Sequence, residues 1–102
     1  MLLSLYLVRR CCLYFILFYE VIEDYLNERE AFRSVHLQLA QEAKERGELI
    51  LAGALSEPTD GAILIFSGTD SSVAEDFAKK DPYVKNGLVT RWYVRKWNAV
   101  IS

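Results

Sequence analysis

The stretch ELILAGALSEPTDGAILIF, residues 48–66, is the part of this 102-residue sequence that decides the fold. Two apolar runs, ELILAGAL at 48–55 and AILIF at 62–66, flank the residues EPTDG. Apolar runs of this length, bounded by proline, aspartate and glycine, are typical of strands, and so short a connection pairs them antiparallel. The stretch therefore predicts a β-hairpin in the middle of the chain.

One helix is predicted on each side of this hairpin. On the N-terminal side, Asn27 can act as the N-cap of a long helix, and Gly47 is a typical C-terminal stop. On the C-terminal side, Ser71 or Ser72 can cap a shorter helix that must end before Pro82.

The outermost segments are predicted to be strands. Residues 13–19 form an unbroken apolar and aromatic run, and residues 88–100 close the domain. The resulting order, βαββαβ, is that of an α+β, ferredoxin-like fold, in which a four-stranded antiparallel sheet carries both helices on one face. The first and third strands are central in that topology, and they are the two most continuously apolar strands here.

Both faces of the first predicted strand are apolar. Alternate residues point to opposite faces, which places Tyr14, Ile16 and Phe18 on one side and Leu13, Phe15, Leu17 and Tyr19 on the other. Two helices can cover only one face, and the other would leave a large apolar patch exposed. We therefore expect a homodimer packed sheet to sheet, with Trp92 and Trp97 either contributing to the interface or belonging to the core.

Composition excludes several classes of protein. The chain is 52% hydrophobic and 25% charged, and 12 Lys and Arg face 14 Asp and Glu, which gives a net charge of -2. This composition is that of a folded protein without the basic surplus of nucleic-acid binders. One histidine and the adjacent Cys11 and Cys12 give no metal-ligand spacing. We expect one domain at residues 13–102, with no metal, no cofactor and no nucleic-acid partner.

Residues 1–12 are predicted to be an extension, to which the sequence assigns no role. The first nineteen residues are strongly apolar, but Arg9 and Arg10 divide them into runs too short to cross a bilayer. The positive charge also follows the apolar stretch, in the reverse order of a secretory signal. We expect no membrane partner and a cytoplasmic location, with mitochondrial import as the alternative because the segment contains arginine and no acid.

The single histidine, His36, is the first candidate for chemistry. It falls inside the apolar stripe that Phe32, Val35, Leu39 and Ala43 define on the first predicted helix. One interpretation is a buried neutral histidine held by one hydrogen bond. The other is an acid–base group tuned by a nearby carboxylate.

Asp81 is the candidate carboxylate, because the sequence Asp-Pro-Tyr at 81–83 holds it at a corner. The two predicted helices run antiparallel, so the start of the first and the end of the second lie at the same end of the domain. Contact with His36 is therefore feasible. The alternative is a helix-end residue that only bonds a turn amide.

Arg33 and Tyr83 are candidates for binding a substrate. Arg33 precedes His36 by one helical turn and can pair with a carboxylate or enolate, or form a salt bridge at the surface. Tyr83 can offer its hydroxyl to the same pocket or only pack its ring.

Three segments together resemble a known family. REAFRSVHLQLAQEAKERGELILAGAL, GAILIFSG and AEDFAKKDPYVKNGLVTRWYVRKW are similar to YciI-like (YCII-related) proteins, a branch of the dimeric α/β-barrel superfamily. The R-x-x-H-L motif at 33–37, the segment 50–53 and the A-x-x-D-P-Y-V run at 78–84 carry the similarity. It implies a ferredoxin-like dimer whose active site pairs a histidine with an aspartate, here His36 and Asp81, and it adds Gly53 to the substrate-binding residues.

The resemblance also implies a reaction type. Relatives include muconolactone isomerase and a chloroaromatic-pathway dehydrochlorinase, so we expect a cofactor-independent lyase or isomerase acting on a small ring compound. Two alternatives stay open, a non-catalytic dimer that binds a metabolite or protein, and a haem protein with His36 as axial ligand. The chain departs from many relatives at Ala54, where they have proline.

Overall fold

The hairpin at the centre of the sequence is present in the computed structural model, which describes residues 13–101. Strands β2 (Leu49–Ala54) and β3 (Gly61–Gly68) pair antiparallel, with Leu64 opposite Ala52. Each strand lies within one or two residues of its predicted bounds.

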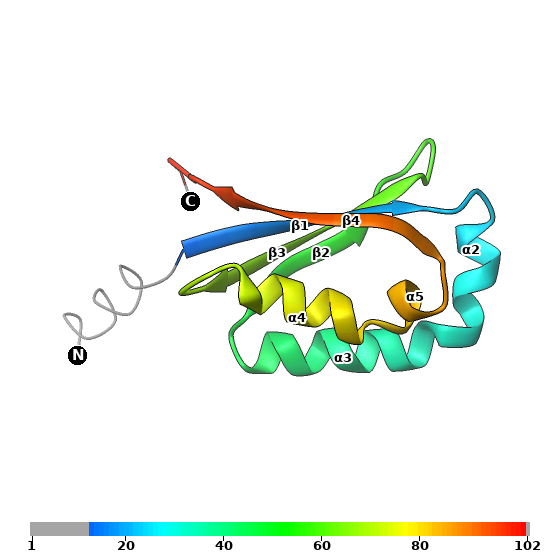
Figure 1. Cartoon of the computed structure of the whole chain (residues 1–102), viewed down its shortest axis with the longest axis horizontal. Helices are drawn as coiled ribbons and strands as arrows, with labels where there is room; N and C mark the ends of the chain where they lie inside the picture. The colour runs from blue at the N-terminus through cyan, green and yellow to red at the C-terminus, as the bar shows by residue number, and fades with distance from the viewer. Residues whose placement is uncertain (1–12, 102) are drawn as a thin grey trace.

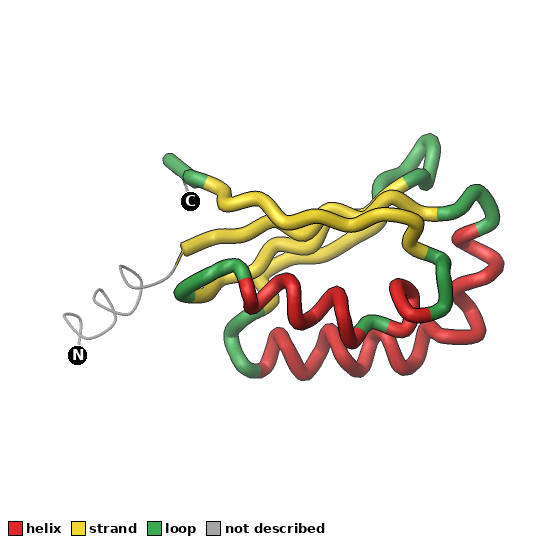
Figure 2. The backbone as a smooth tube through the Cα atoms, in the orientation of Figure 1, coloured by secondary structure: helices red, strands yellow, loops and turns green. Residues whose placement is uncertain are grey.

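Two further strands complete one antiparallel sheet (Figure 2). β1 (Leu13–Val21) and β4 (Val89–Trp97) pair with each other, and β1 also pairs with β3, which gives the order β2-β3-β1-β4. The first and third strands are therefore central, as predicted. β4 ends at Trp97, three residues before the predicted limit.

The helices all lie on one face of this sheet (Figure 1). The two longest are α3 (Arg33–Glu45) and α4 (Ser72–Lys80), and the shorter ones are α2 (Tyr25–Glu28), the 3₁₀ helix η1 (Arg29–Phe32) and α5 (Pro82–Lys85). This arrangement confirms the predicted ferredoxin-like α+β fold with its layer of helices on one side.

The first helix begins differently from the prediction. Asn27 lies inside α2 instead of capping a helix, and its Nδ2 donates to Asp24 Oδ1 at 2.7 Å. Helical turns start earlier because the buried Tyr25 anchors this segment to the core. The C-terminal stop is as predicted, since α3 ends at Glu45 and Gly47 has a φ of 78°, a conformation that glycine adopts without steric cost.

The second helix ends where proline requires, but the chain then turns into another helix. α4 stops at Lys80, and Pro82 occupies the first position of α5 with Asp81 as its N-cap. Proline suits that position because its fixed φ matches the helix and its missing N–H would have no partner there. Neither serine hydroxyl caps α4; the Ser72 amide donates instead to Asp70 Oδ1 at 2.9 Å.

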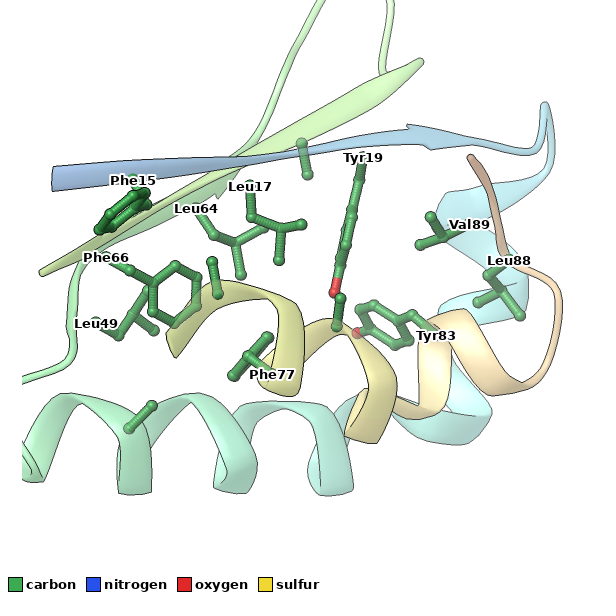
Figure 3. Packing of buried hydrophobic residues seen from close by; sticks show 14 of the residues in the cluster. Phe15, Leu17, Tyr19, Leu49, Leu64, Phe66, Phe77, Tyr83, Leu88 and Val89 are labelled. Atoms are coloured by element: carbon green, nitrogen blue, oxygen red, sulfur yellow. The ribbon is translucent and has the colours of Figure 1, made fainter. Parts of the chain in front are cut away.

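The core lies between the sheet and the helices. Phe15, Leu17 and Tyr19 alternate along β1 and are buried on the covered face (Figure 3). Leu64 and Phe66 of β3 continue the same layer beneath them.

The other face of the sheet carries no helix and is also apolar. Tyr14, Ile16 and Phe18 of β1 lie on it together with four apolar or aromatic cross-strand neighbours, Ile63, Ile65, Tyr93 and Trp97. The remaining cross-strand neighbours of these three residues are polar, Ser67 opposite Tyr14 and Arg95 opposite Ile16. We call the seven apolar or aromatic residues the open face. Trp97 belongs to it, with its ring centroid 6.5 Å from that of Tyr14, whereas Trp92 lies on the covered face and packs against the core.

Some predictions fall outside the described residues. The proposed extension at 1–12, with both cysteines, is one of them. Within residues 13–101, no helix has the length and apolar character needed to cross a membrane.

Candidate active site

Asp81 is a carboxylate with no exposed surface at the junction of α4 and α5. Its Oδ1 accepts hydrogen bonds from the Tyr83 backbone N–H at 3.0 Å and from His36 Nδ1 at 2.9 Å, and its Oδ2 accepts from the Tyr19 hydroxyl at 2.7 Å. Asp81 therefore bonds a turn amide, as the alternative interpretation proposed, but it does not bond that amide alone, because it also bonds the histidine. Three donors compensate the cost of burying its charge.

His36 lies in the first turn of α3, and its side chain reaches Asp81 at the junction of α4 and α5. A carboxylate only accepts hydrogen bonds, so the hydrogen lies on Nδ1 and Nε2 carries the free lone pair when the ring is neutral. The side chain is 15% exposed, so the ring is largely shielded but accessible.

The ring of His36 is held by two aromatic neighbours. Tyr83 stacks on it with ring centroids 4.0 Å apart and planes 14° from parallel, and Phe77 meets it edge-on at 6.3 Å. Together with the bond to Asp81, these contacts fix the plane of the imidazole.

One residue of the expected apolar stripe points elsewhere. Val35 is 58% exposed, so its inclusion in the stripe was wrong. The side of α3 that faces the sheet is formed by His36, Leu39, Ala40 and Ala43. At 3.6 residues per turn, Val35 lies at the edge of this side and not at its centre, so its side chain turns toward solvent.

Tyr19 was not predicted as a site residue. From the covered face of β1 its side chain points toward the helices (Figure 3), and its hydroxyl reaches Asp81. Burial, and then the negative charge of Asp81 and the hydrogen bond to it, raise the pKa of Tyr19 far above its ordinary value of 10.0. Tyr19 therefore stays protonated and acts as a permanent donor to the carboxylate. The alternation of β1 predicted its face, but no local signal predicted its partner.

A cavity of about 270 Å³ opens beside His36, between the start of α3 and the edge strand β2. Of the other predicted residues, Arg33, Gly53 and Tyr83 line it, whereas Asp81 does not. Its lining also includes Tyr19, Tyr25 and Arg29, which were not predicted. At about 30 Å³ per water-sized group, this volume holds a molecule of about nine non-hydrogen atoms, such as one substituted ring.

Arg29 is a second residue that sequence analysis missed. It lies in η1, with its guanidinium carbon 5.4 Å from the ring centroid of Tyr25. Spaced four residues before Arg33, it reaches the same cavity because the two positions are neighbours on a helical surface. The predicted helix already placed Arg29 one turn before Arg33, but no signal in the sequence showed that both line a cavity.

A larger cavity, of about 710 Å³, lies at the far end of α3 beside α4. It is lined largely by charged groups, and Arg46 and Glu48 there pair with each other at 3.0 Å. Because His36 lines the smaller cavity and no histidine lines the larger one, the smaller cavity is the better equipped for proton transfer. Within residues 13–101, no cluster of three metal-ligating side chains occurs.

The described geometry can be compared with known proteins. Among solved structures, the chain is similar to 5-chloro-2-hydroxyhydroquinone dehydrochlorinase from Burkholderia phenoliruptrix in complex with 2,5-dihydroxybenzoquinone, with a TM-score of 0.69 and 19% identity over 83% of this chain and 93% of that one. It is also similar to an uncharacterized NIPSNAP-like domain protein from Burkholderia xenovorans, with a TM-score of 0.58 and 11% identity over 90% and 89% of the two chains. At such identities the similarity shows a shared fold.

A NIPSNAP family protein from Agrobacterium tumefaciens gives a TM-score of 0.55 at 10% identity, covering 85% of this chain and 91% of that one. A search of curated proteins gives no match. The model of the YCII-related domain matches residues 12–98, nearly the whole chain. The chain therefore belongs to the family of proteins with a YCII-related domain.

Proposed function

We propose that this protein is a cofactor-independent enzyme that uses His36 and Asp81 for acid–base chemistry, isomerisation or elimination, on a small ring compound. The observation that carries the proposal is the chain of hydrogen bonds from Tyr19 through Asp81 to His36, whose ring borders a cavity of single-ring size. A fixed imidazole with a buried carboxylate on one nitrogen is a suitable proton acceptor on the other.

Each residue would have a distinct role in the reaction. Nε2 of His36 would take a proton from a hydroxyl or from a carbon next to a carbonyl, and Asp81 would stabilise the imidazolium that forms. In an isomerisation, the released electron pair moves to the carbonyl oxygen, and the proton returns at another carbon. In an elimination, the pair forms a new double bond while chloride leaves with the electrons of the carbon–chlorine bond. Neither reaction requires an oxidant or a reductant.

Arg33 supports the proposal because it can stabilise the negative charge that develops on the substrate. It lines the same cavity as His36, and a guanidinium stabilises an enolate or carboxylate oxygen. Similarity to a dehydrochlorinase supports elimination as one of the two reactions, at the level of the fold.

The test is turnover of muconolactone-type lactones and chlorinated hydroxyhydroquinones, followed by absorbance and by release of chloride. We expect His36→Gln to lower the rate by about 10²- to 10⁴-fold, the usual contribution of a positioned general base. Gln38→Ala, an exposed change on the same helix, serves as the matched control and should keep the full rate. An equal rate in His36→Gln and Gln38→Ala would refute the role of the base, and binding without turnover of any compound would favour the non-catalytic alternative.

We also propose that the active form is a homodimer formed through the open face. The seven apolar or aromatic open-face residues lie together on three strands, with Ser67 and Arg95 beside them, and no described helix covers them (Figure 1). Apolar surfaces of this extent in a small protein usually mark an interface. A second copy brings an identical sheet of matching shape, which no helix within residues 13–101 supplies.

A further inference from the structure

Two buried polar atoms at the wall of the site cavity have no hydrogen-bond partner among the described residues. They are the Nε of Arg29 and the hydroxyl oxygen of Tyr83. Buried polar groups in proteins are nearly always bonded, and the exceptions commonly mark places where a ligand supplies the partner. Both residues line the same cavity, which makes a shared partner possible.

Aromatic contacts connect these two atoms to the histidine. The guanidinium carbon of Arg29 lies 5.4 Å from the centroid of the Tyr25 ring, which meets Tyr83 edge-on at 5.6 Å. Tyr83 in turn stacks on His36 at 4.0 Å. The side chains of Arg29, Tyr25, Tyr83 and His36 therefore form one continuous wall. This wall carries both the unbonded donors and the proposed proton acceptor.

The charged side chains that line this wall are arginines. The residues that line the cavity include Arg29 and Arg33 and no acid, and in residues 13–101 neither arginine forms an ion pair. Asp81, the buried acid nearby, pairs with neither arginine, since His36, Tyr19 and the Tyr83 amide occupy its oxygens.

Both unbonded groups are donors under ordinary conditions. A guanidinium has N–H groups only and stays charged. Burial raises the pKa of the Tyr83 hydroxyl above 10.0, and the nearby Arg33 offsets this only in part, so the tyrosine stays protonated. These two donors, together with the positive charges of Arg29 and Arg33, match an oxygen that carries negative charge.

We infer that Arg29 and the Tyr83 hydroxyl form an oxyanion-binding subsite, and that the substrate is a single-ring organic anion whose carboxylate or ionised hydroxyl binds there. The subsite orients the ring so that its reacting atom faces Nε2 of His36. This substrate class rests on the proposed function, but the subsite itself can be tested by binding alone.

The test is equilibrium binding by calorimetry of three probes to the full chain. Benzoate carries a carboxylate, 4-nitrophenolate an ionised hydroxyl, and benzamide the same ring without charge. We expect one or both anions to bind at millimolar concentration or below, and benzamide to bind at least about 10-fold more weakly, as expected for lost hydrogen bonds to charged groups. Equal binding of benzamide and the anions, or no anion binding at millimolar concentration, would overturn the inference.

Three variants assign the effect to the subsite. Arg29→Gln and Tyr83→Phe should each lower the affinity for the anion by about 10-fold or more. Arg46→Gln is the matched control, because that arginine lies at the far end of α3 and pairs with Glu48. An equal effect of Arg29→Gln and Arg46→Gln would show general charge attraction and refute the subsite.

Tyr83→Phe separates binding from folding. Its hydroxyl has no partner in the described protein, so its removal should leave the midpoint of urea unfolding unchanged while anion binding falls. A lower midpoint with unchanged anion binding would overturn the role of the hydroxyl.

The variant His36→Gln distinguishes this inference from the proposed reaction. If it loses turnover and still binds the anion, both stand. If the anion binds in an Arg29-dependent manner but no variant or wild-type protein shows turnover, the subsite stands and the proposed reaction fails. If turnover depends on His36 but anions bind no better than benzamide, the reaction stands and the subsite fails.

Discussion

Asp81 has a structural task and a proposed chemical task, and one side chain serves both. It caps α5 through the Tyr83 amide, and it also accepts hydrogen bonds from His36 and Tyr19. Because the carboxylate is fully buried, each of its donors contributes to stability as well as to the alignment of the histidine.

Replacement of Asp81 by asparagine should therefore lower stability as well as turnover. The amide keeps nearly the same shape but loses the charge that strengthens its three hydrogen bonds, and its NH₂ group must face one of the former donors. We expect the free energy of unfolding in urea to fall by about 1.5–3 kcal/mol, the typical value for hydrogen bonds to a charged group.

Asp76→Asn provides the control for this measurement. It makes the same chemical change at an exposed position of α4, where little effect on stability is expected. If both variants unfold at the same urea concentration, the hydrogen bonds of Asp81 do not contribute to stability as described.

At the scale of elements, β3 of the hairpin pairs with β1 along its length and approaches it closely at Gly61. A Cβ added at Gly61 would lie 2.7 Å from the Tyr19 carbonyl oxygen, a backbone atom that cannot rotate away. This approach positions the start of β3 next to the strand that carries Tyr19, and so helps to place the hydroxyl that bonds Asp81.

Gly61→Ala should consequently destabilise the sheet, whereas Gly53→Ala should not. At Gly61 the backbone must shift, and we expect a loss of about 1–3 kcal/mol in thermal or urea unfolding. At Gly53 an added Cβ meets nothing within 4 Å, so the change in stability should stay within about 0.5 kcal/mol. A loss at Gly53 as large as that at Gly61 would contradict this account of the packing.

At the scale of the whole molecule, the sheet separates two different surfaces. Its covered face forms the core and supports the site, while its open face presents aromatic and aliphatic residues. The proposed dimer would bury the second surface without obstructing the site cavity, which lies on the helical side between α3 and β2.

A lysine at the centre of the open face should dissociate this dimer. Ile65 lies on the central strand β3 opposite Ile16, and Ile65→Lys would place a charge in the interface. We expect the dissociation constant measured by analytical ultracentrifugation to rise by about 30-fold or more, the effect of losing a strong contact residue.

Val35→Lys gives the matched control for the dimer. Val35 is 58% exposed on α3, on the opposite side of the sheet, and its replacement should leave the association unchanged. Wild-type protein that sediments as a monomer at micromolar concentration would refute the dimer, and equal effects of the two lysines would refute the assigned interface.

Sequence alone determined most of the fold and made a contact between two site residues feasible, a pair that the family resemblance also implied. The alternation of apolar residues along 13–19, the turn at 57–61 and the proline at 82 act locally, so they predicted the strands, the hairpin and the end of α4. The placement of His36 and Asp81 at one end of the domain followed from the direction of two antiparallel helices, which βαββαβ order fixes.

Only the tertiary structure decided the other members of the site and the start of the first helix. Tyr19 is 62 residues from Asp81 in the chain, and its hydroxyl reaches the carboxylate because β1 crosses above the junction of α4 and α5. Arg29 faces the cavity because α2 and η1 precede α3, a start that depends on the burial of Tyr25 and not on the capping signal at Asn27. Local patterns specify elements, whereas distant contacts choose which side chains meet, because such contacts form only when the elements pack.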